Sequence, residues 1–368
     1  MKIAIVTPFC WPVNEFYEGY AGKMVKILKN AGQDVTVICS DVYPDGKRIK
    51  VKEETKEGIK IKRYKNYLNL FYFAKVFFPD VRGYDVIHCC GGYRHPHVFY
   101  AFITKGKAKF LLSPFFPAYK RASIKGIFVN ILMNFIDLTI GNPLIRNSYC
   151  LAETSLEAKW LKNLGTKNIA IIPAPLEDIC FKKIKSSFRE KYKLKGNVIL
   201  WLGRHHQVKN LGELIRAAQY VDATFVFGGK ESDVTKQWKS LAEKLNVENK
   251  IVWLNKDLDT KERLEAYVAC NLFVLPSIKE GLGAVMIEAM AQKKPVIATS
   301  TGGLPAIVPD NFCLYNLGDV QTLASKINII LKDKRLASKI GKSGYEKAKQ
   351  YRFSKVSKDY LSLLKNLK

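Results

Sequence analysis

The chain of 368 residues lacks the sequence signals of several protein classes. It has eight cysteines but no C-x-x-C pair. A structural zinc site needs clustered ligands, so we expect reduced, buried thiols and no bound metal. A repeat of solenoid length, a low-complexity tract and the P-loop spacing G-x-x-x-x-G-K-[ST] are also missing. These absences exclude solenoid proteins, disordered chains and P-loop enzymes.

Long uninterrupted apolar runs are missing as well. The most apolar stretch, residues 124–145, is broken by polar side chains at Lys125, Asn130, Asn134, Asp137 and Asn142. This pattern favours a packed helix over a bilayer span. The opening MKIAIVTPFCWP is short and has no small-residue cleavage site, so it predicts a buried first strand and not a signal sequence. We expect a folded cytoplasmic protein, peripheral at most to the inner face of the cell membrane.

Acidic residues are scarce, because 33 Asp and Glu stand against 60 Lys and Arg, a net charge of +27. Such an excess favours anionic partners: nucleic acid, acidic lipid or phosphorylated small molecules. Residues 60–125 hold 13 Lys and Arg, 2 Asp and Glu and 16 Phe and Tyr. At least half of these rings are expected in the core. Lys and Arg side chains that alternate with the remaining aromatic rings fit either an anionic membrane surface or a groove for single-stranded nucleic acid. Because the sequence has no signature of a nucleic-acid-binding module, we favour the membrane.

The sequence does contain two series of short apolar strands, each strand followed by a helical stretch. Such alternation indicates an α/β protein with parallel sheets covered on both faces. The first series runs from KIAIV to IAIIP, the second from NVILWLG to KPVIATS, and a helix follows from residue 320 into the tail. A lysine-rich segment with two prolines, residues 173–197, lies between them. We therefore predict one domain over residues 1–175, with the tail from about 350 to 368 packing back on it, and a second over 176–349.

A glycine-containing turn follows one strand of the second series. The strand LFVLPS ends at Ser277, and the turn Glu280-Gly281-Leu282-Gly283 leads into a helix. Glycines at a helix start let a ligand approach backbone N–H groups, whose partial positive charge suits a phosphate. The turn therefore predicts an anion site at the carboxyl end of this strand.

Basic side chains follow another strand of the same series. The strand NVILWLG ends in Gly203 and is followed by Arg204 and Lys209. Guanidinium and ammonium groups at a strand end can hold a diphosphate and neutralise charge that grows as a bond to it breaks. Because parallel strands end at one edge of a sheet, we expect these groups near the glycine turn.

Two carboxylates flank the predicted anion site. Glu280 lies in the turn, and Glu288 lies in the following helix, about a third of a turn from its apolar face. Carboxylates suit sugar hydroxyls, which are good donors to them. The alternative is an ordinary helix-start glutamate and a solvated one.

These stretches together resemble the retaining nucleotide-sugar glycosyltransferases of the GT-B fold, specifically glycosyltransferase family 4. The resemblance also includes the EGY turn at Gly19, AGQDVTVI, YDVIH and IAIIP. It implies two Rossmann-like domains facing across a cleft, with a nucleoside-diphosphate sugar, as co-substrate, held by the second and the acceptor by the first. Lys209 and Arg204 would bind the diphosphate, Glu288 the nucleotide ribose and Glu280 the transferred sugar.

Positions in the first domain carry less specific expectations. His88 ends a predicted strand, where it either contacts acceptor or donor or is a satisfied strand-end histidine. Gly19 lies in the EGY turn, and Phe115 follows the strand KFLLS where family members often have a histidine. Two further departures are Ala174-Pro175 in place of Asn-Gly and Ala306 in place of a glutamate, and they bear on the choice of donor sugar.

Two motifs that suggest metal binding have simpler readings. Asp257-Leu258-Asp259 has the D-x-D form that metal-dependent glycosyltransferases use, but it precedes a helix, where aspartate is an ordinary cap. The histidine pair His205 and His206 lacks a third ligand at suitable spacing. We expect no metal, with the basic side chains supplying the positive charge.

The sequence therefore predicts a retaining, metal-independent hexosyltransferase that moves a sugar to a hydroxyl of a lipid-linked or anionic glycan. A sugar-nucleotide epimerase of related fold and a catalytically silent, membrane-attached binding subunit stay open as alternatives. The nucleotide, the sugar and the oligomeric state cannot be read from the residues.

Overall fold

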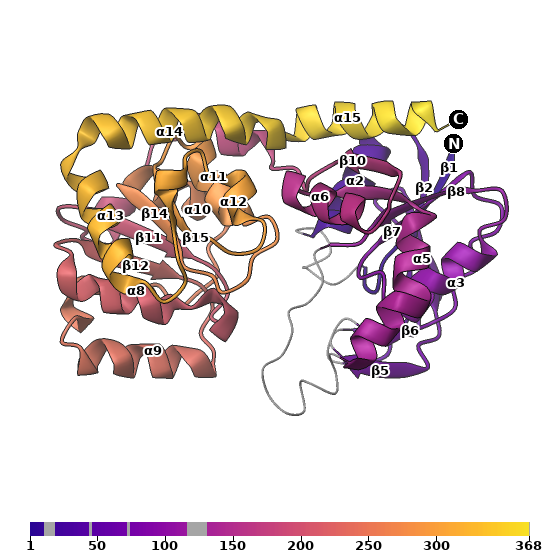
Figure 1. Ribbon diagram of the computed structural model, residues 1–368, viewed down its shortest axis with the longest axis horizontal. Helices are drawn as coiled ribbons and strands as arrows, with labels where there is room; N and C mark the ends of the chain where they lie inside the picture. Colours follow the sequence, from indigo (N-terminus) through magenta and orange to yellow (C-terminus); the bar gives the residue numbers. More distant parts are fainter. Residues whose placement is uncertain (11–18, 44–45, 72–73, 116–130, 368) are drawn as a thin grey trace. The chain divides into compact units, whose positions relative to one another are not determined.

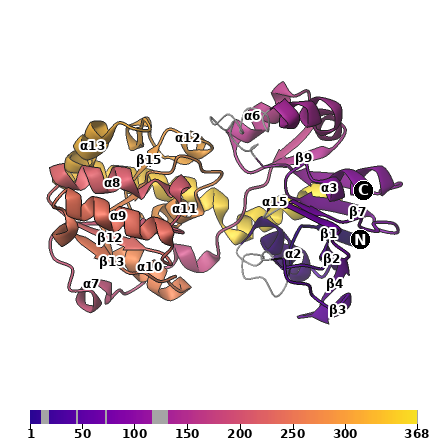
Figure 2. The ribbon, with the colours of Figure 1, turned by 90° about the horizontal axis from the view of Figure 1, so that it is seen from below.

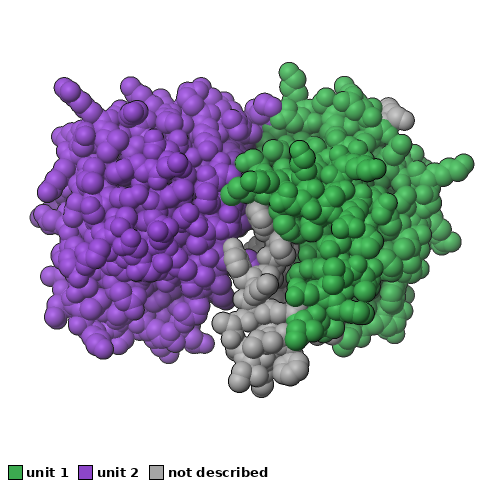
Figure 3. Space-filling model, in the orientation of Figure 1, with its two compact units in different colours: residues 1–175, 356–368 green, residues 176–355 purple. Residues whose placement is uncertain are grey.

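The computed structural model describes residues 1–10, 19–43, 46–71, 74–115 and 131–367. It contains two compact units (Figure 3). Unit 1 comprises residues Met1–Pro175 and Val356–Lys368, and unit 2 comprises Leu176–Lys355. Each unit is an α/β layer structure with its own sheet.

Unit 1 is built on a sheet with the strand order β10-β9-β8-β7-β1-β2-β4-β3. Its strands are β1 (Lys2–Val6), β2 (Asp34–Ser40), β3 (Glu53–Lys56), β4 (Ile59–Tyr64), β7 (Val86–Cys90), β8 (Lys109–Ser113), β9 (Tyr149–Ala152) and β10 (Asn168–Ile171). All neighbours pair in parallel except β3 and β4, which are antiparallel. The central strands β1, β2, β7 and β8 are buried over nearly their whole length, as continuous apolar runs in a covered sheet should be.

The helices of unit 1 include one from the end of the chain. They are α2 (Tyr20–Asn30), α3 (Pro96–Thr104), the π-helix η1 (Asp137–Gly141), α5 (Asn142–Arg146), α6 (Ser155–Asn163) and the part of α15 (Phe353–Asn366) that lies beyond residue 355. On α15, Val356, Tyr360 and Leu364 are spaced by four residues and are buried. This apolar stripe packs α15 into unit 1.

Unit 2 has a six-stranded, all-parallel sheet with the order β13-β12-β11-β14-β15-β16. The strands are β11 (Val198–Leu202), β12 (Thr224–Gly228), β13 (Ile251–Trp253), β14 (Leu272–Leu275), β15 (Val296–Thr299) and β16 (Leu314–Tyr315). The chain leaves β11 toward β12 on one side and returns to β14 on the other. The sheet therefore changes direction between β11 and β14, the position where doubly wound sheets bind ligands.

Helices cover both faces of the unit 2 sheet (Figures 1 and 2). They are α7 (Phe188–Lys191), α8 (Leu211–Ala217), α9 (Asp233–Lys244), α10 (Thr260–Ala269), α11 (Ala284–Ala291), α12 (Leu304–Ile307), α13 (Val320–Lys332) and α14 (Lys334–Ala348). The helix α8 contacts α9 and α13, whereas α11 contacts α10 and α14. Short 3-10 turns complete the unit: η2 (Asp178–Phe181), η3 (Gln207–Lys209), η4 (Ala218–Tyr220), η5 (Glu248–Lys250), η6 (Asn311–Cys313) and η7 (Lys349–Tyr351).

The structure confirms the predicted α/β class with two parallel-strand sheets. Of the predicted packed helix over residues 124–145, residues 124–130 lie outside the described residues. Residues 131–136, η1 and α5 are helical, but the prediction that the apolar side chains are packed is wrong for Ile131, Phe135 and Leu138, which are exposed. The antiparallel pair β5 (Leu68–Phe71) and β6 (Ala74–Val76) was not expected from the sequence. In the part of the chain that the structure describes, no helix is long and apolar enough to cross a bilayer.

Candidate active site

Three loops of unit 2 meet at the carboxyl ends of β11, β14 and β15. The backbone N–H of Ile278, after β14, donates to the carbonyl of Val208, after β11, at 2.8 Å. The carbonyl of Ser277 accepts the hydroxyls of Thr299 at 2.6 Å and Thr301 at 2.9 Å, both at the end of β15. These bonds fix the predicted site loops to one another at the point where the sheet changes direction.

An ion pair between Lys209 and Glu280 lies at this junction. The ammonium nitrogen Nζ of Lys209 donates to Glu280 Oε2 at 2.6 Å, and the side chains are only 19% and 15% exposed. The hydroxyl of Ser277, which is fully buried, donates to the same carboxylate oxygen at 3.2 Å. The structure therefore brings three of the predicted residues into direct contact.

The glycine turn is held by close backbone approach. Gly302 has φ +57, and a Cβ there would lie 2.0 Å from the carbonyl oxygen of Glu280, which accepts the N–H of Gly303. Gly283, with φ +64, precedes the first residue of α11 without a side-chain cap. Leu282 is buried, and Gly281 is exposed with open space where a Cβ would stand. The first N–H groups of α11 have no acceptor within the helix, so this turn presents donors.

Arg204 lies in the loop after β11 and is exposed, and it has no hydrogen bond or ion pair to the described residues. The main chain just before Arg204 lies close to the end of β12. The N–H of Gly203 donates to the carbonyl of Gly228, and a Cβ on Gly229 would lie 1.9 Å from the Gly203 carbonyl oxygen. The guanidinium is therefore available to an anion while its main chain is fixed by β11 and β12.

The next residue, His205, is buried among aromatic rings. Its ring centroid lies 5.5 Å from that of Trp201 and 5.4 Å from that of Trp238. Its Nδ1 is 2.7 Å from the hydroxyl of Thr235, and its carbonyl accepts the hydroxyl of Ser232 at 2.6 Å. Burial lowers the pKa of His205. This histidine anchors the loop that carries Arg204 to the start of α9.

Glu288 is buried on α11 and is held from α10. Its Oε2 accepts the hydroxyl of Tyr267 at 2.9 Å and lies 2.9 Å from Nε of Arg263. Burial, then the Glu288 charge, raise the pKa of the Tyr267 phenol, so this residue stays a donor. The sequence did not single out either α10 partner. The carboxylate is held by one hydrogen bond, from Tyr267, and by the ion pair with Arg263 before any ligand arrives.

The motifs with a possible metal role have other functions in the structure. Asp259 caps α10, because its Oδ1 accepts the N–H of Glu262 at 2.8 Å, as the cap interpretation predicted. Asp257 Oδ1 accepts the N–H of Lys230 at 3.3 Å. Within the described ranges, His, Cys, Asp and Glu form no group of three that could hold a metal ion.

The predicted positions of unit 1 lie around a buried histidine. Nδ1 of His88 is 2.8 Å from the hydroxyl of Tyr360 on α15, and Nε2 is 2.8 Å from the hydroxyl of Ser113. Burial lowers the pKa of His88 to about 3. Both ring nitrogens are occupied and the ring is fully buried, which is the arrangement of the satisfied strand-end histidine.

The two other unit 1 positions flank Tyr20. Gly19 precedes α2 without a side-chain cap, and the ring of Phe115 packs edge-on against Tyr20 at 5.5 Å between centroids. Phe115 has φ +54, an uncommon conformation for a bulky residue. Glu18 and Phe116, which complete the quoted motifs, lie outside the described residues.

Unit 2 matches a known sequence family. The sequence model of the glycosyl transferases group 1 family matches residues 182–347, nearly the whole of the unit. The carboxyl-terminal unit of this chain is therefore similar to the glycosyl transferases group 1 family along nearly its whole length, and we call it the group 1 unit. Arg204, Lys209, Glu280 and Glu288 all lie within the matched region.

Curated relatives of this group 1 unit match only part of their own length. The chain is 36% identical over 99 residues to the sulfoquinovosyl transferase of Arabidopsis thaliana, which covers 26% of this chain and 19% of that protein. It is 26% identical over 193 residues to the N-acetyl-alpha-D-glucosaminyl L-malate synthase of Bacillus anthracis, half of either chain. The aligned regions thus span half or less of these two relatives.

Solved structures match the whole chain in fold. Sucrose-phosphate synthase from Thermosynechococcus elongatus superposes with a TM-score of 0.78 at 20% identity, covering 100% of this chain and 98% of that one. HepE from Anabaena, in complex with UDP-glucose, superposes with a TM-score of 0.72 at 18% identity and complete coverage of both chains. These likenesses show the GT-B fold, which contains two parallel-sheet units.

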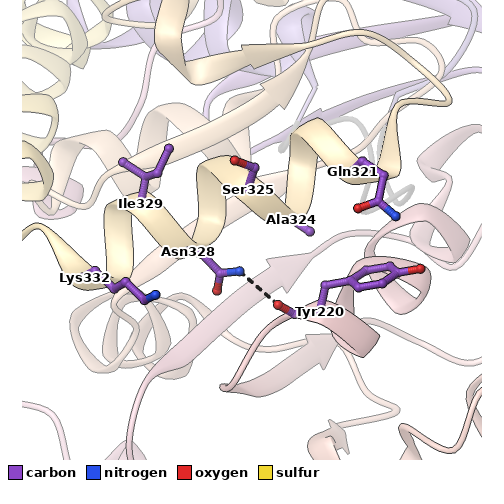
Figure 4. Close-up of a pocket in the computed structure, with 7 residues that line it drawn as sticks. All are labelled: Tyr220, Gln321, Ala324, Ser325, Asn328, Ile329 and Lys332. Atoms are coloured by element: carbon purple, nitrogen blue, oxygen red, sulfur yellow. Dashed lines mark hydrogen bonds between the residues drawn. The ribbon is translucent and has the colours of Figure 1, made fainter.

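A surface pocket of about 340 Å³ lies in the group 1 unit (Figure 4). It is formed between α13 and η4, where Asn328 donates to the carbonyl of Tyr220 at 2.9 Å. The turn η4 precedes β12, so the pocket is near the amino ends of the strands. None of the predicted site residues lines it.

Sequence reasoning missed several residues that position the group 1 site. Thr299 and Thr301 bind the carbonyl before the glycine turn, and Arg263 and Tyr267 bind Glu288. The threonines were detectable, because ATSTGG after a predicted strand is a polar strand-end cluster of the same kind as the others. The two α10 residues gave no local signal, since their role depends on the packing of α10 against α11.

Proposed function

We propose that this protein is a glycosyltransferase that moves a sugar from a nucleoside-diphosphate sugar to an acceptor hydroxyl, with the anomeric configuration retained. The observation that carries the proposal is the Lys209–Glu280 pair, fixed where three strand-end loops of a group 1 unit meet. Likeness to a structure holding UDP-glucose supports a nucleotide sugar as donor.

Positive charge from the chain itself would stabilise the departing diphosphate. The bond between the anomeric carbon and the diphosphate oxygen breaks, and a bond from that carbon to the acceptor oxygen forms on the same face. The proton of the acceptor hydroxyl passes to the departing diphosphate, so no enzyme nucleophile is required. Lys209, Arg204 and the N–H groups at the start of α11 would offset the growing negative charge without a metal.

The carboxylates would hold the sugars. Glu280, beside Lys209, would accept hydroxyls of the transferred sugar, and Glu288, oriented by Arg263 and Tyr267, would accept those of the ribose. Both contacts seen for Glu288 fall on Oε2, which leaves the carboxylate a second oxygen for this purpose.

The acceptor is proposed to be a lipid-linked or anionic glycan at the inner face of the cell membrane. The net charge of +27 supports an anionic environment. Of the aromatic residues between 60 and 125, Tyr67 and Phe78 are exposed and Phe77 is buried, so part of that region is core, as expected, and part is accessible.

A ligand screen followed by product analysis tests the proposal. UDP, GDP, ADP and their sugar conjugates are compared by thermal shift, since a ligand at about 100 times its Kd stabilises the fold by about 2.7 kcal/mol. The best conjugate is then incubated with a lipid-linked acceptor, with and without EDTA. A glycoside of retained configuration in both cases is expected. Epimerised nucleotide sugar without glycoside, no turnover of any conjugate, or complete loss of transfer in EDTA would each contradict part of the proposal.

A further inference from the structure

One helical segment of unit 1 presents large apolar side chains to the outside. Residues 131–136 and η1 form about three helical turns, in which Ile131 is 60% exposed, Leu132 54%, Phe135 62% and Leu138 71%. Their spacing puts these four on one side of the helix, and we call them the outward apolar face. Helices of globular proteins normally turn such a stripe toward the core, and exposed clusters of this kind mark interaction sites.

The opposite side of the segment is fastened to the body of unit 1. The guanidinium of Arg94 makes two bonds to the carboxylate of Asp137, Nε to Oδ1 at 2.7 Å and Nη2 to Oδ2 at 2.5 Å. A Cβ on Gly141 would lie 2.7 Å from the ring of Tyr93, so the helix rests closely on that ring. The outward apolar face is therefore the side of the helix that points away from Arg94 and Tyr93.

Charge indicates what would cover this face. From residue 86 to residue 152 the sequence holds eight Lys and Arg and a single acid, Asp137, which Arg94 already neutralises. A helix with a bare apolar face in a strongly basic, acid-poor region has the two features that drive binding to anionic bilayers. A second copy of the chain would bring the same positive charge to the contact, which opposes self-association.

We propose that the outward apolar face enters the headgroup boundary of an anionic bilayer and attaches unit 1 to it. This inference rests on the proposed function and deepens it, because it names the element that brings the enzyme to a lipid-linked acceptor. The apolar side chains supply the contact with the acyl boundary, and the excess of Lys and Arg in residues 86–152 of the sequence supplies the preference for acidic lipid.

Vesicle co-sedimentation of the full chain tests the inference. The double variant Phe135→Gln/Leu138→Gln removes two apolar side chains while keeping good helix formers. Vesicles of phosphatidylcholine with phosphatidylglycerol should bind the wild type, and the double variant at least about tenfold more weakly. Vesicles of phosphatidylcholine alone should bind both weakly. The matched control is Ile329→Gln on α13 of unit 2, which is 41% exposed and should bind like the wild type.

Separate readouts keep the outcomes distinct. The double variant should keep the wild-type melting temperature and donor affinity, because the replaced side chains are exposed and lie in the other unit from the donor site. Equal vesicle binding by wild type and double variant, or a dimer that the double variant dissociates, would overturn the inference. If transfer to a lipid-linked acceptor is observed without vesicle binding, the proposed function stands and the inference fails. Lys209→Ala should lose transfer but bind vesicles normally.

Discussion

Nζ of Lys209 and Oε2 of Glu280 lie 2.6 Å apart, although the two residues come from different strand-end loops. Both side chains are mostly shielded from water, so the electrostatic attraction between the two charges is less screened than in a surface ion pair. Removing one partner leaves the other charged and poorly solvated. A bound diphosphate would therefore share Lys209 with a carboxylate that already fixes the position of the ammonium.

The first prediction concerns Lys209 in the proposed reaction. Lys209→Ala should lose roughly 10²- to 10³-fold in turnover, the usual effect of removing one group that stabilises developing charge. The measurement is the single-turnover rate at saturating donor. Lys239→Ala serves as control, because Lys239 forms an exposed pair with Glu231 in the same unit. Unchanged turnover in Lys209→Ala would remove this residue from the catalytic site.

The second prediction separates two glycines of the same turn region. Gly302→Ala should destabilise unit 2 by about 2 kcal/mol or more, because its Cβ would stand 2.0 Å from the Glu280 carbonyl at a positive φ. Gly281→Ala should leave stability nearly unchanged, because the space around it is open. Donor affinity should nevertheless fall at least about tenfold in Gly281→Ala if the diphosphate approaches that backbone. Titration of the donor and denaturant unfolding of both variants provide the check, and normal affinity in Gly281→Ala would place the diphosphate elsewhere.

The third prediction concerns Glu288. Glu288→Gln keeps an acceptor for Tyr267 but removes the charge opposite Arg263. Donor affinity should fall about tenfold or more, the scale of a hydrogen bond to a charged group. Tyr267→Phe should have a smaller effect, because it removes a positioning donor and leaves the carboxylate. Isothermal titration with the preferred nucleotide sugar compares the two, and a larger loss in Tyr267→Phe would contradict the ribose assignment.

The fourth prediction is a pH dependence of stability from unit 1. Glu157 on α6 is 2% exposed, and burial, reinforced by Glu153, raises its pKa from 4.5 to about 8. Its folded pKa lies above the unfolded one, so its stabilising contribution is full below pH 4.5 and is lost as pH rises to about 8.

The matched variant isolates this group. Glu157→Gln keeps an acceptor for the N–H of Glu153, which the carboxylate binds at 2.7 Å. Relative to the variant, the wild type should lose roughly 2 to 4 kcal/mol of unfolding free energy between these pH limits. Urea unfolding at a series of pH values measures the difference. Parallel curves for the two proteins would show that folding does not change the pKa of Glu157.

The layered architecture could be predicted from the sequence because it depends on local patterns. Runs such as VILWL and LFVL are fully buried strands, and the glycine turn begins a helix where the spacing predicted it. The contact between Lys209 and Glu280 was accessible to the same reasoning, since adjacent parallel strands deliver their loops to one edge.

Other features depend on packing between distant segments. The partners of Glu288 lie on α10, and the partner of His88, Tyr360, lies on a helix 272 positions later in the chain. No local spacing in the sequence predicts either contact. The outward apolar face was misread for a related reason. Apolar periodicity shows that a helix has an apolar side, but only the arrangement of its neighbours decides whether that side is covered.

Tyr360, whose hydroxyl contacts Nδ1 of His88, lies in the part of α15 that follows unit 2 in the chain. Synthesis proceeds from the amino terminus, so the ribosome must finish the whole of unit 2 before it adds Tyr360. Until then the imidazole of His88 lacks the hydroxyl of Tyr360 as a partner, and the surface of unit 1 that buries Val356 and Leu364 is uncovered. Unit 1 can therefore complete its core only after unit 2 has been synthesised, and loss of α15 would remove the partner of a strand residue 272 positions earlier.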